Sequence, residues 1–136
     1  MTNKFKKVFG IVIAGIMLLA ITNSVSAASS QSGELNGARV SGYITINASS
    51  ASASTGINLP PNTLSSVSVD ITYYYRDKSD GKILIPSTGG GGGNIAVTVT
   101  RPNPDTTRYS SDYAIANHTV RYSGQTWTAK TNKTYY

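Results

Sequence analysis

The residues of this sequence that could carry chemistry are few. The chain has 136 residues, no Cys and a single His, His118. Without thiols, a Cys nucleophile, a disulfide framework and a Cys-ligated metal site are excluded, and one imidazole cannot close a zinc site. His118 shares the face of its segment with Ala116 and Val120, and no G-x-S-x-G nucleophile motif accompanies it. We therefore expect a half-buried, hydrogen-bonded structural His118.

The acidic residues are spread along the chain and form no obvious pair. Most of them lie in segments where Asp caps a turn, and the whole set after residue 27 is Glu34, Asp70, Asp77, Asp80, Asp105 and Asp112. Glycoside hydrolysis needs two carboxyl groups held at a fixed separation, which this spacing does not single out. The sequence thus predicts a non-enzymatic protein without catalytic, cofactor-binding or metal-binding residues. A secreted hydrolase that uses Asp112 or His118 is the weakest alternative.

Aromatic side chains are the feature with positive functional content. The chain contains nine Tyr and one Trp, and exposed rings of this kind make contact surfaces with a hydrogen-bonding tip. We expect Tyr73, Tyr75 and Trp127 to fill a core that is short of Leu and Phe. Tyr74 and Tyr136 fall on the opposite faces of their segments. They are predicted to form an exposed ligand or partner contact together with Arg76, Arg121 and Lys130.

These side chains must be positioned by β-strands, because apolar and polar residues alternate along most of the chain. The clearest segment is 66–76, in which one face reads Val67, Val69, Ile71, Tyr73 and Tyr75. Further strands are predicted over residues 38–47, 51–55, 82–85, 95–100, 113–122 and 125–135. About seven short strands with no helix among them predict an all-β fold, a single antiparallel β-sandwich of the immunoglobulin-like or jelly-roll-like kind. A small barrel is the alternative.

The predicted domain covers residues 37–136. Two segments, one just before it and one inside it, are not expected to be strands. Residues 28–36 are polar and are predicted to form a flexible N-terminus. Residues 87–94 contain five consecutive glycines. Because a glycine run is flexible by composition, the sequence predicts a Gly-rich loop there. The segment lacks the Lys-Ser/Thr of a phosphate-binding loop, so no nucleotide site is expected.

The first 27 residues have the pattern of a secretory signal peptide. Three lysines precede an uncharged run, residues 8–21, which leads to small residues that end at Ala27. The run is shorter than the roughly 20 apolar residues that cross a bilayer. We therefore expect cleavage near Ala27 and secretion to the exterior. An uncleaved segment that tethers the protein to the membrane is the alternative.

Removal of this segment changes the charge balance. The whole chain has 12 basic and 6 acidic residues and a formal net charge of +6, and three of the lysines precede residue 8. The chain from residue 28 therefore keeps nine basic and six acidic residues, a net charge of 9 − 6 = +3. The nine are spread along the chain. Neither a nucleic-acid partner nor a membrane contact after cleavage is expected from so mild a charge.

A resemblance to known proteins rests on three segments. Residues 118–129, HTVRYSGQTWTA, together with residues 51–55 and 67–75, resemble small secreted β-rich proteins of Gram-positive bacteria, which are rich in Ser, Thr, Ala and Tyr and have no described function. The resemblance implies a bacterial exported protein. It brings no activity, ligand or functional residue with it.

Together these observations predict a secreted, non-enzymatic protein that acts as a binding or surface-associated structural domain of the bacterial cell envelope or exterior. The expected partner is a cell-wall glycan or a surface protein, and no cofactor is expected. A secreted cationic antagonist of the bacteriocin type is the alternative, because the chain is small, exported and cationic. Residues 94–101 and the C-terminal strand are flat and Thr-rich, and such edge strands also allow self-association.

Overall fold

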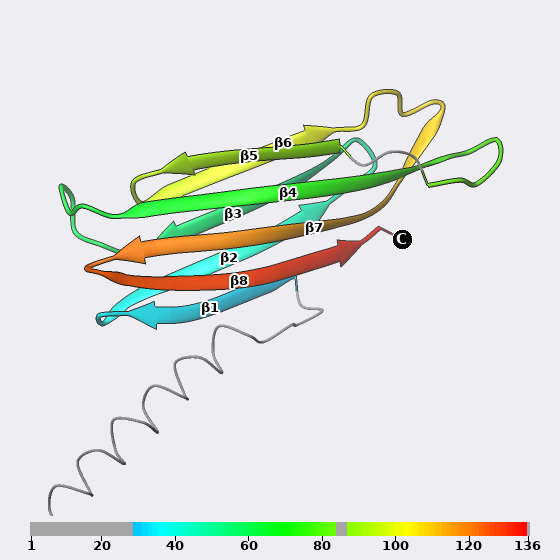
Figure 1. The fold of residues 1–136 in the computed structure, drawn as a ribbon. Helices are drawn as coiled ribbons and strands as arrows, with labels where there is room; N and C mark the ends of the chain where they lie inside the picture. Colours follow the sequence, from blue (N-terminus) through cyan, green and yellow to red (C-terminus); the bar gives the residue numbers. More distant parts are fainter. Residues whose placement is uncertain (1–28, 84–86, 136) are drawn as a thin grey trace, which may run out of the picture.

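The computed structural model describes residues 29–83 and 87–135, and it shows two antiparallel four-stranded sheets packed face to face (Figure 1). The first sheet has the strand order β1 (Ser30–Leu35), β2 (Ala38–Ile46), β3 (Ser50–Ile57) and β6 (Ala96–Pro102). The second sheet has the order β5 (Ser87–Gly93), β4 (Ser66–Asp77), β7 (Tyr109–Tyr122) and β8 (Gln125–Thr134). The predicted all-β antiparallel sandwich is confirmed.

The core lies between the two sheets and follows the predicted alternation. On β4, the inward residues Val67, Val69, Ile71 and Tyr73 are each at most 1% exposed. Apolar residues form two clusters along the sandwich, one around Ile71 and Tyr73 and the other around Val40 and Trp127. The burial predicted for Tyr73 and Trp127 is therefore confirmed, whereas Tyr75 is only partly buried against the first cluster.

A layer of polar side chains separates the two apolar clusters. His118 on β7 is only 1% exposed, so the expectation of a half-buried imidazole is wrong. Its Nδ1 lies 2.8 Å from Oγ1 of Thr55 on β3, and its Nε2 lies 2.8 Å from Oγ1 of Thr131 on β8. Both ring nitrogens thus have a partner, which is what a buried imidazole requires. The ring links the two sheets.

Gly42 on β2 makes room for this ring. A Cβ atom added at Gly42 would lie 2.5 Å from Cγ of His118, far inside van der Waals contact. Residue 42 lies on the inward face of β2, and its side chain has to be a hydrogen atom because the imidazole from the opposite sheet occupies the space.

The predicted flexible N-terminus, residues 28–36, is wrong over Ser30–Leu35, which form strand β1 paired with β2. The two strands are joined by Asn36 and Gly37, which have φ values of 45° and 77°. This is the Asn-Gly hairpin turn that matches the twist of two antiparallel strands. Leu35, at 4% exposure, adds its side chain to the second cluster.

The predicted Gly-rich loop, residues 87–94, is also wrong over Ser87–Gly93, which form strand β5 along the edge of β4. The missing side chains explain why glycine suits this strand. A Cβ at Gly91 would lie 2.7 Å from Cγ2 of Val99, and one at Gly89 would lie 2.7 Å from Cδ of Arg101. Side chains of β6 in the first sheet fill the space that β5 leaves empty. The glycines let the two sheets close together at this side.

The described residues form eight strands, which are six of the seven predicted ones together with β1 and β5. Of the predicted strand over residues 82–85 the structure describes only Lys82 and Ile83, and Ile83 forms a bridge with Arg76. Residues 84–86 lie outside the described part. The predicted signal peptide, residues 1–27, lies outside it as well. Within residues 29–83 and 87–135, no helix has the length and apolar character needed to cross a membrane.

Candidate functional site

A largely polar surface, interrupted by Ile115 of β7, covers the outer side of the second sheet. It consists of the even-numbered residues 66–74 of β4, the odd-numbered residues 113–121 of β7 and the even-numbered residues 126–134 of β8, and we call it the polar face. These residues point away from the core because side chains alternate along a strand. The burial pattern agrees along most of each strand, since the intervening residues are the more buried ones, except at the end of β8 where Lys133 is exposed.

The pairing of the strands arranges the polar face in rows. Ser68, Thr119 and Thr128 are direct cross-strand neighbours in one row. Asp70, Asn117 and Lys130 form the next row. Neighbouring strands lie about 4.8 Å apart and successive outward residues about 7 Å apart along a strand. The face therefore offers a regular grid of hydroxyl, amide and charged groups that can both donate and accept hydrogen bonds.

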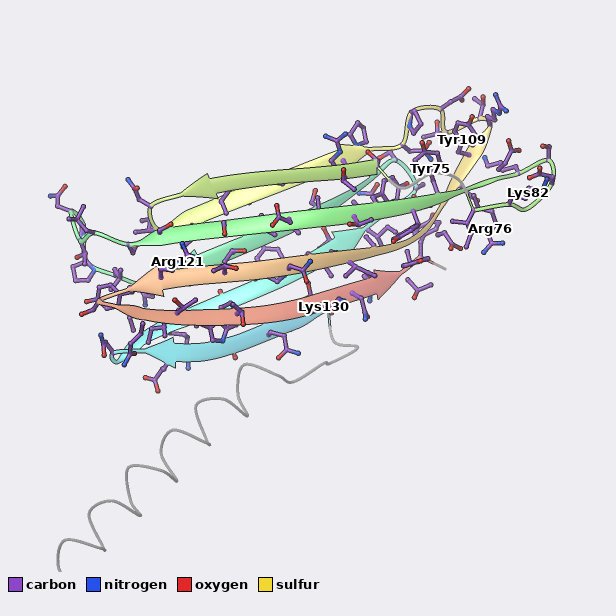
Figure 2. All side chains as sticks on the ribbon, viewed as in Figure 1. Tyr75, Arg76, Lys82, Tyr109, Arg121 and Lys130 are labelled. Carbon is purple, nitrogen blue, oxygen red and sulfur yellow. The ribbon has the colours of Figure 1, made fainter. Side chains whose placement is uncertain are left out.

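The four predicted contact residues that the structure describes come from this sheet, but they do not gather at one place. Tyr74 and Arg76 lie near one end of β4. Figure 2 shows Arg76 at this end of the sheet, Lys130 in the middle of β8 and Arg121 at the opposite end of β7. Arg121 is paired with Ser66, eight residues before Tyr74, which corresponds to about 27 Å along the strand. Tyr136 lies outside the described residues. The structure therefore supports an extended surface more than a compact pocket.

Tyr74 is less exposed than expected, because its ring stacks on the ring of Tyr113 from β7. The two ring centroids lie 4.2 Å apart and the planes are inclined by 14°. Both side chains are half-buried. Each ring covers one face of the other, so the pair offers ring edges, hydroxyl tips and at most one open face per ring to a ligand. The Tyr74–Tyr113 pair ends the polar face on this side.

Arg76 is held by groups of the protein itself. Its Nη2 lies 3.0 Å from Oδ1 of Asp112, and its Nη1 donates a hydrogen bond to the carbonyl oxygen of Gly81 at 2.6 Å. A ligand that binds the Arg76 guanidinium would have to compete with both contacts. We therefore assign Arg76 a structural part in fixing the turn after β4 to the start of β7.

A second arginine at the same end was not among the predicted site residues. Arg108 donates from Nε to Oδ2 of Asp77 at 3.2 Å, and its guanidinium lies 5.0 Å from the ring centroid of Tyr109. Hydrogen bonds from Ser79 lower the pKa of the buried Asp77 carboxyl, and Arg108 lowers it further. Tyr75 packs against Tyr109 with centroids 5.2 Å apart. These contacts stabilise the end of the sandwich. The sequence carries no local signal for the contacts of Arg108 with Asp77 and of Tyr75 with Tyr109, because they join segments that are distant in the sequence.

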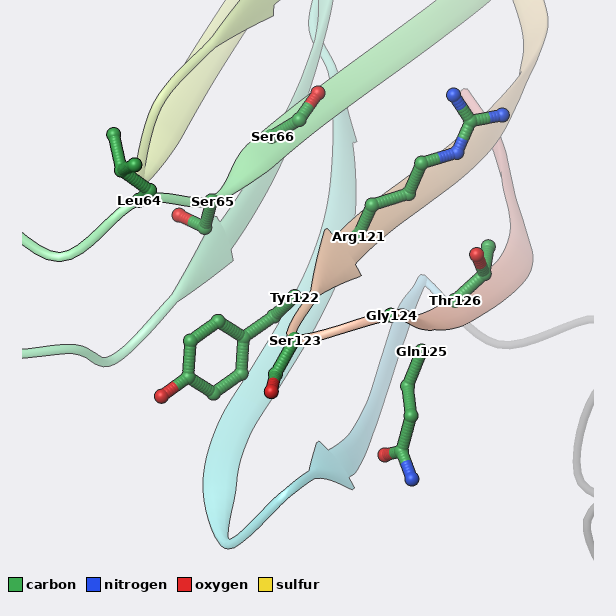
Figure 3. Close-up of a pocket in the computed structure, with 9 residues that line it drawn as sticks. All are labelled: Leu64, Ser65, Ser66, Arg121, Tyr122, Ser123, Gly124, Gln125 and Thr126. Atoms are coloured by element: carbon green, nitrogen blue, oxygen red, sulfur yellow. The ribbon is translucent and has the colours of Figure 1, made fainter.

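The end of the polar face around Arg121 is hollowed. A depression of about 380 Å³ lies where the β7–β8 turn meets the segment before β4, and its lining includes Leu64, Arg121 and Tyr122 (Figure 3). Leu64 is 91% exposed. The Arg121 side chain extends over the polar face while Tyr122 points the other way (Figure 3). Within the described residues the Arg121 guanidinium forms no ion pair, so it can bind an acidic or hydroxyl group of a ligand.

The single histidine of the chain lies in the core rather than on the polar face. His118 is buried, and both ring nitrogens are used in hydrogen bonds inside the core. Burial also lowers the pKa of His118 to about 4, so the imidazole is neutral at physiological pH. Among residues 29–83 and 87–135, no three His, Cys, Asp or Glu side chains lie together as metal ligands would.

Comparison with known proteins adds no assignment. No protein-family model matches the chain, and a search of curated proteins found no match either. Conclusions about function therefore depend on the polar face and on the surfaces around it.

Proposed function

We propose that this protein is a secreted, non-enzymatic β-sandwich that binds a glycan of the bacterial cell envelope or its surroundings through the polar face. The single observation that supports this most is the grid of hydroxyl, amide and charged groups, interrupted by Ile115, between Arg121 and the Tyr74–Tyr113 pair. Glycans present hydroxyl groups in a repeating pattern. A flat grid of groups that both donate and accept is suited to them.

The extent of the surface favours an extended polymer as ligand. From Tyr113 to Arg121 the polar face spans nine residues of β7, about 27 Å for the eight steps between them, which is several sugar units long. The row with Asn117 and Lys130 crosses its middle. Each hydrogen bond on such an exposed surface contributes about 1 kcal/mol net, so useful affinity requires several of them, and the rows provide several.

Export is the second part of the proposal. It is supported by the signal-peptide pattern of residues 1–27 and by the resemblance of residues 118–129 to small secreted β-rich proteins. An exported domain without Cys must be stabilised by its core and its hydrogen bonds alone. The hydrogen bonds of His118 to Thr55 and Thr131 and the close packing of the two sheets contribute to this stability.

The proposal predicts selective loss of binding when the grid is removed. In the triple variant Asn117→Ala, Thr119→Ala, Thr128→Ala, three neighbouring donors and acceptors of the polar face are lost. We expect binding to insoluble cell-envelope glycan, measured by co-sedimentation, to weaken at least about tenfold. The matched control is Ser32→Ala, Ser41→Ala, Thr45→Ala on the exposed outer side of the first sheet, and it should bind like the wild type. Equal binding by both triple variants, or no binding by the wild type, would refute the proposal.

A further inference from the structure

Each sheet ends in two edge strands, and the four edges lie in two pairs. On one side of the sandwich β5 lies beside β6, and on the other side β8 lies beside β1 (Figure 1). An edge strand has backbone N–H and C=O groups on its outer side without a strand partner, which makes it a template for another chain. The sandwich therefore has two sides that could each accept further strands.

The strand directions make these two sides complementary. Directions alternate through each sheet, because every neighbouring pair in both sheets is antiparallel. With four strands per sheet, β8 runs opposite to β5, and β6 runs opposite to β1. A second copy placed beside the first, in nearly the same orientation, thus brings its β8 antiparallel to β5 and its β1 antiparallel to β6. Both sheets continue at once.

Strand β5 is open to such pairing. Natural edge strands are commonly protected by charged side chains, prolines or inward-pointing charges. β6 has the inward residue Arg101 and ends at Pro102, and β8 carries Lys130 and Lys133. In contrast, the sequence of β5 is Ser-Thr followed by five glycines, so the strand carries no charge or ring, and its last five residues have no side chain that could obstruct a neighbouring strand.

When the β8 strand of one copy pairs with β5 of the next without stagger, a positively charged residue of one copy comes close to a negatively charged residue of the other. Gly90 of β5 lies in the same row as Asp70, Asn117 and Lys130. A copy added without stagger therefore sets its Lys130 opposite Gly90. The carboxylate of Asp70 lies beside Gly90, because its Oδ1 is within contact distance of the position that a Cβ atom of residue 90 would occupy. Within the described residues, neither Asp70 nor Lys130 takes part in an ion pair.

We propose that copies of this chain assemble head to tail, with β8 and β1 of one copy against β5 and β6 of the next, and with Lys130 bound to Asp70 across Gly90. This contact is heterologous, so it leaves a free side at each end and builds a filament. Sheet twist turns each copy relative to its neighbour. The assembly does not depend on glycan binding, although it would join the polar faces into one long surface.

The same register also produces a repulsive contact between two positively charged residues. Lys133 would lie opposite Ser87, whose Oγ accepts a hydrogen bond from Nε of Arg101 at 3.0 Å. Two cations then approach each other at this end of the interface. Lys133→Ala is therefore expected to strengthen the assembly, whereas Lys130→Ala weakens it.

Charge reversal tests the proposal with the chain from Ala28 onward, which contains all eight strands. The wild type should form larger species as concentration rises, as measured by sedimentation velocity at low salt. Asp70→Lys places two cations, and Lys130→Asp two anions, at the same contact. Each variant alone should need at least about tenfold more protein to assemble. An equimolar mixture of the two should assemble again, because every contact between unlike copies is then complementary.

Two controls separate this contact from general effects of charge. Lys82→Asp reverses an exposed charge in the turn after β4, outside all four edge strands, and should assemble like the wild type. Circular dichroism should show the same fold for every variant. A wild type that stays monomeric throughout its soluble range would overturn the proposal. So would assembly of both single variants at wild-type concentrations, or a mixture that stays monomeric.

Discussion

Replacing Gly42 by alanine is expected to lower the free energy of unfolding by about 3 kcal/mol or more. The added methyl group would lie 2.5 Å from Cγ of His118, and this ring cannot move aside without losing the hydrogen bonds to Thr55 and Thr131. Overpacking of a core costs about 1–3 kcal/mol, and each buried polar group left without a partner costs a similar amount. For a domain of this size the melting temperature should fall by more than about 10 °C.

The matched control for this substitution is Gly56→Ala on the neighbouring strand β3. There the nearest atom to an added Cβ is the carbonyl oxygen of Ile95 at 3.6 Å, an ordinary contact. We expect a change of less than about 1 kcal/mol, since alanine also restricts the unfolded chain. In a His118→Ala background, Gly42→Ala should lose most of its cost because the ring is gone. Additive effects of the two substitutions in this double-mutant cycle would contradict the packing account.

Acidification from pH 7 to pH 4 is expected to remove about 3 kcal/mol of stability through His118 alone. Burial lowers the pKa of His118 in the folded protein from 6.5 to about 4. Between these two values the unfolded chain binds the proton and the folded chain does not, so stability is present above pH 6.5 and is lost as pH falls. One unit of pKa corresponds to about 1.36 kcal/mol. Chemical denaturation at a series of pH values measures the loss directly.

His118→Gln removes the titrating group and should flatten this dependence between pH 7 and pH 4, whatever its effect on stability at neutral pH. Below pH 4 a second loss is expected in both proteins. Hydrogen bonds from Ser79 and Thr107 lower the pKa of Asp77 and Asp105 in the folded state, and protonation of these carboxyls removes that contribution. An unchanged slope in His118→Gln between pH 7 and pH 4 would show that His118 is not the group responsible.

The alternation of side chains was sufficient to predict the faces of the long strands. Val67, Val69 and Ile71 are buried as predicted, because the period of two is a local property that a single strand already shows. The same reasoning failed at β5, where glycine has no side chain and so no pattern. Strand β5 forms because Val97 and Val99 of the other sheet occupy the space that its glycines leave. Such a cause lies outside any local window of sequence.

Strand β1 was missed for a different reason. Its residues are mostly polar, since only Leu35 at its end contributes to the core. The turn at Asn36 and Gly37 was nevertheless visible in the sequence, and it is among the strongest short-range signals of a hairpin. Greater weight on turn chemistry would have predicted this strand.

The candidate surface could be predicted only in part. Tyr74, Arg76, Arg121 and Lys130 were expected to be exposed and to lie together, and the structure places them on one sheet but along its whole length. Their separation follows from the register between β4, β7 and β8, which joins residues about 50 positions apart such as Asp70 and Asn117. The register also creates the row that links Asp70 with Lys130. No pattern within one segment encodes it.

The central claim is that the polar face of the second sheet binds an envelope glycan. Hydroxyl-radical footprinting with mass spectrometry tests it most directly, because each sheet has tyrosine on its outer side. Tyr74 and Tyr113 lie on the polar face, whereas Tyr43, which is 50% exposed, lies on the outer side of the first sheet. With soluble glycan fragments at low protein concentration, we predict protection of Tyr74 and Tyr113 and unchanged labelling of Tyr43. Protection of Tyr43 alone, or of none of the three, would contradict the account.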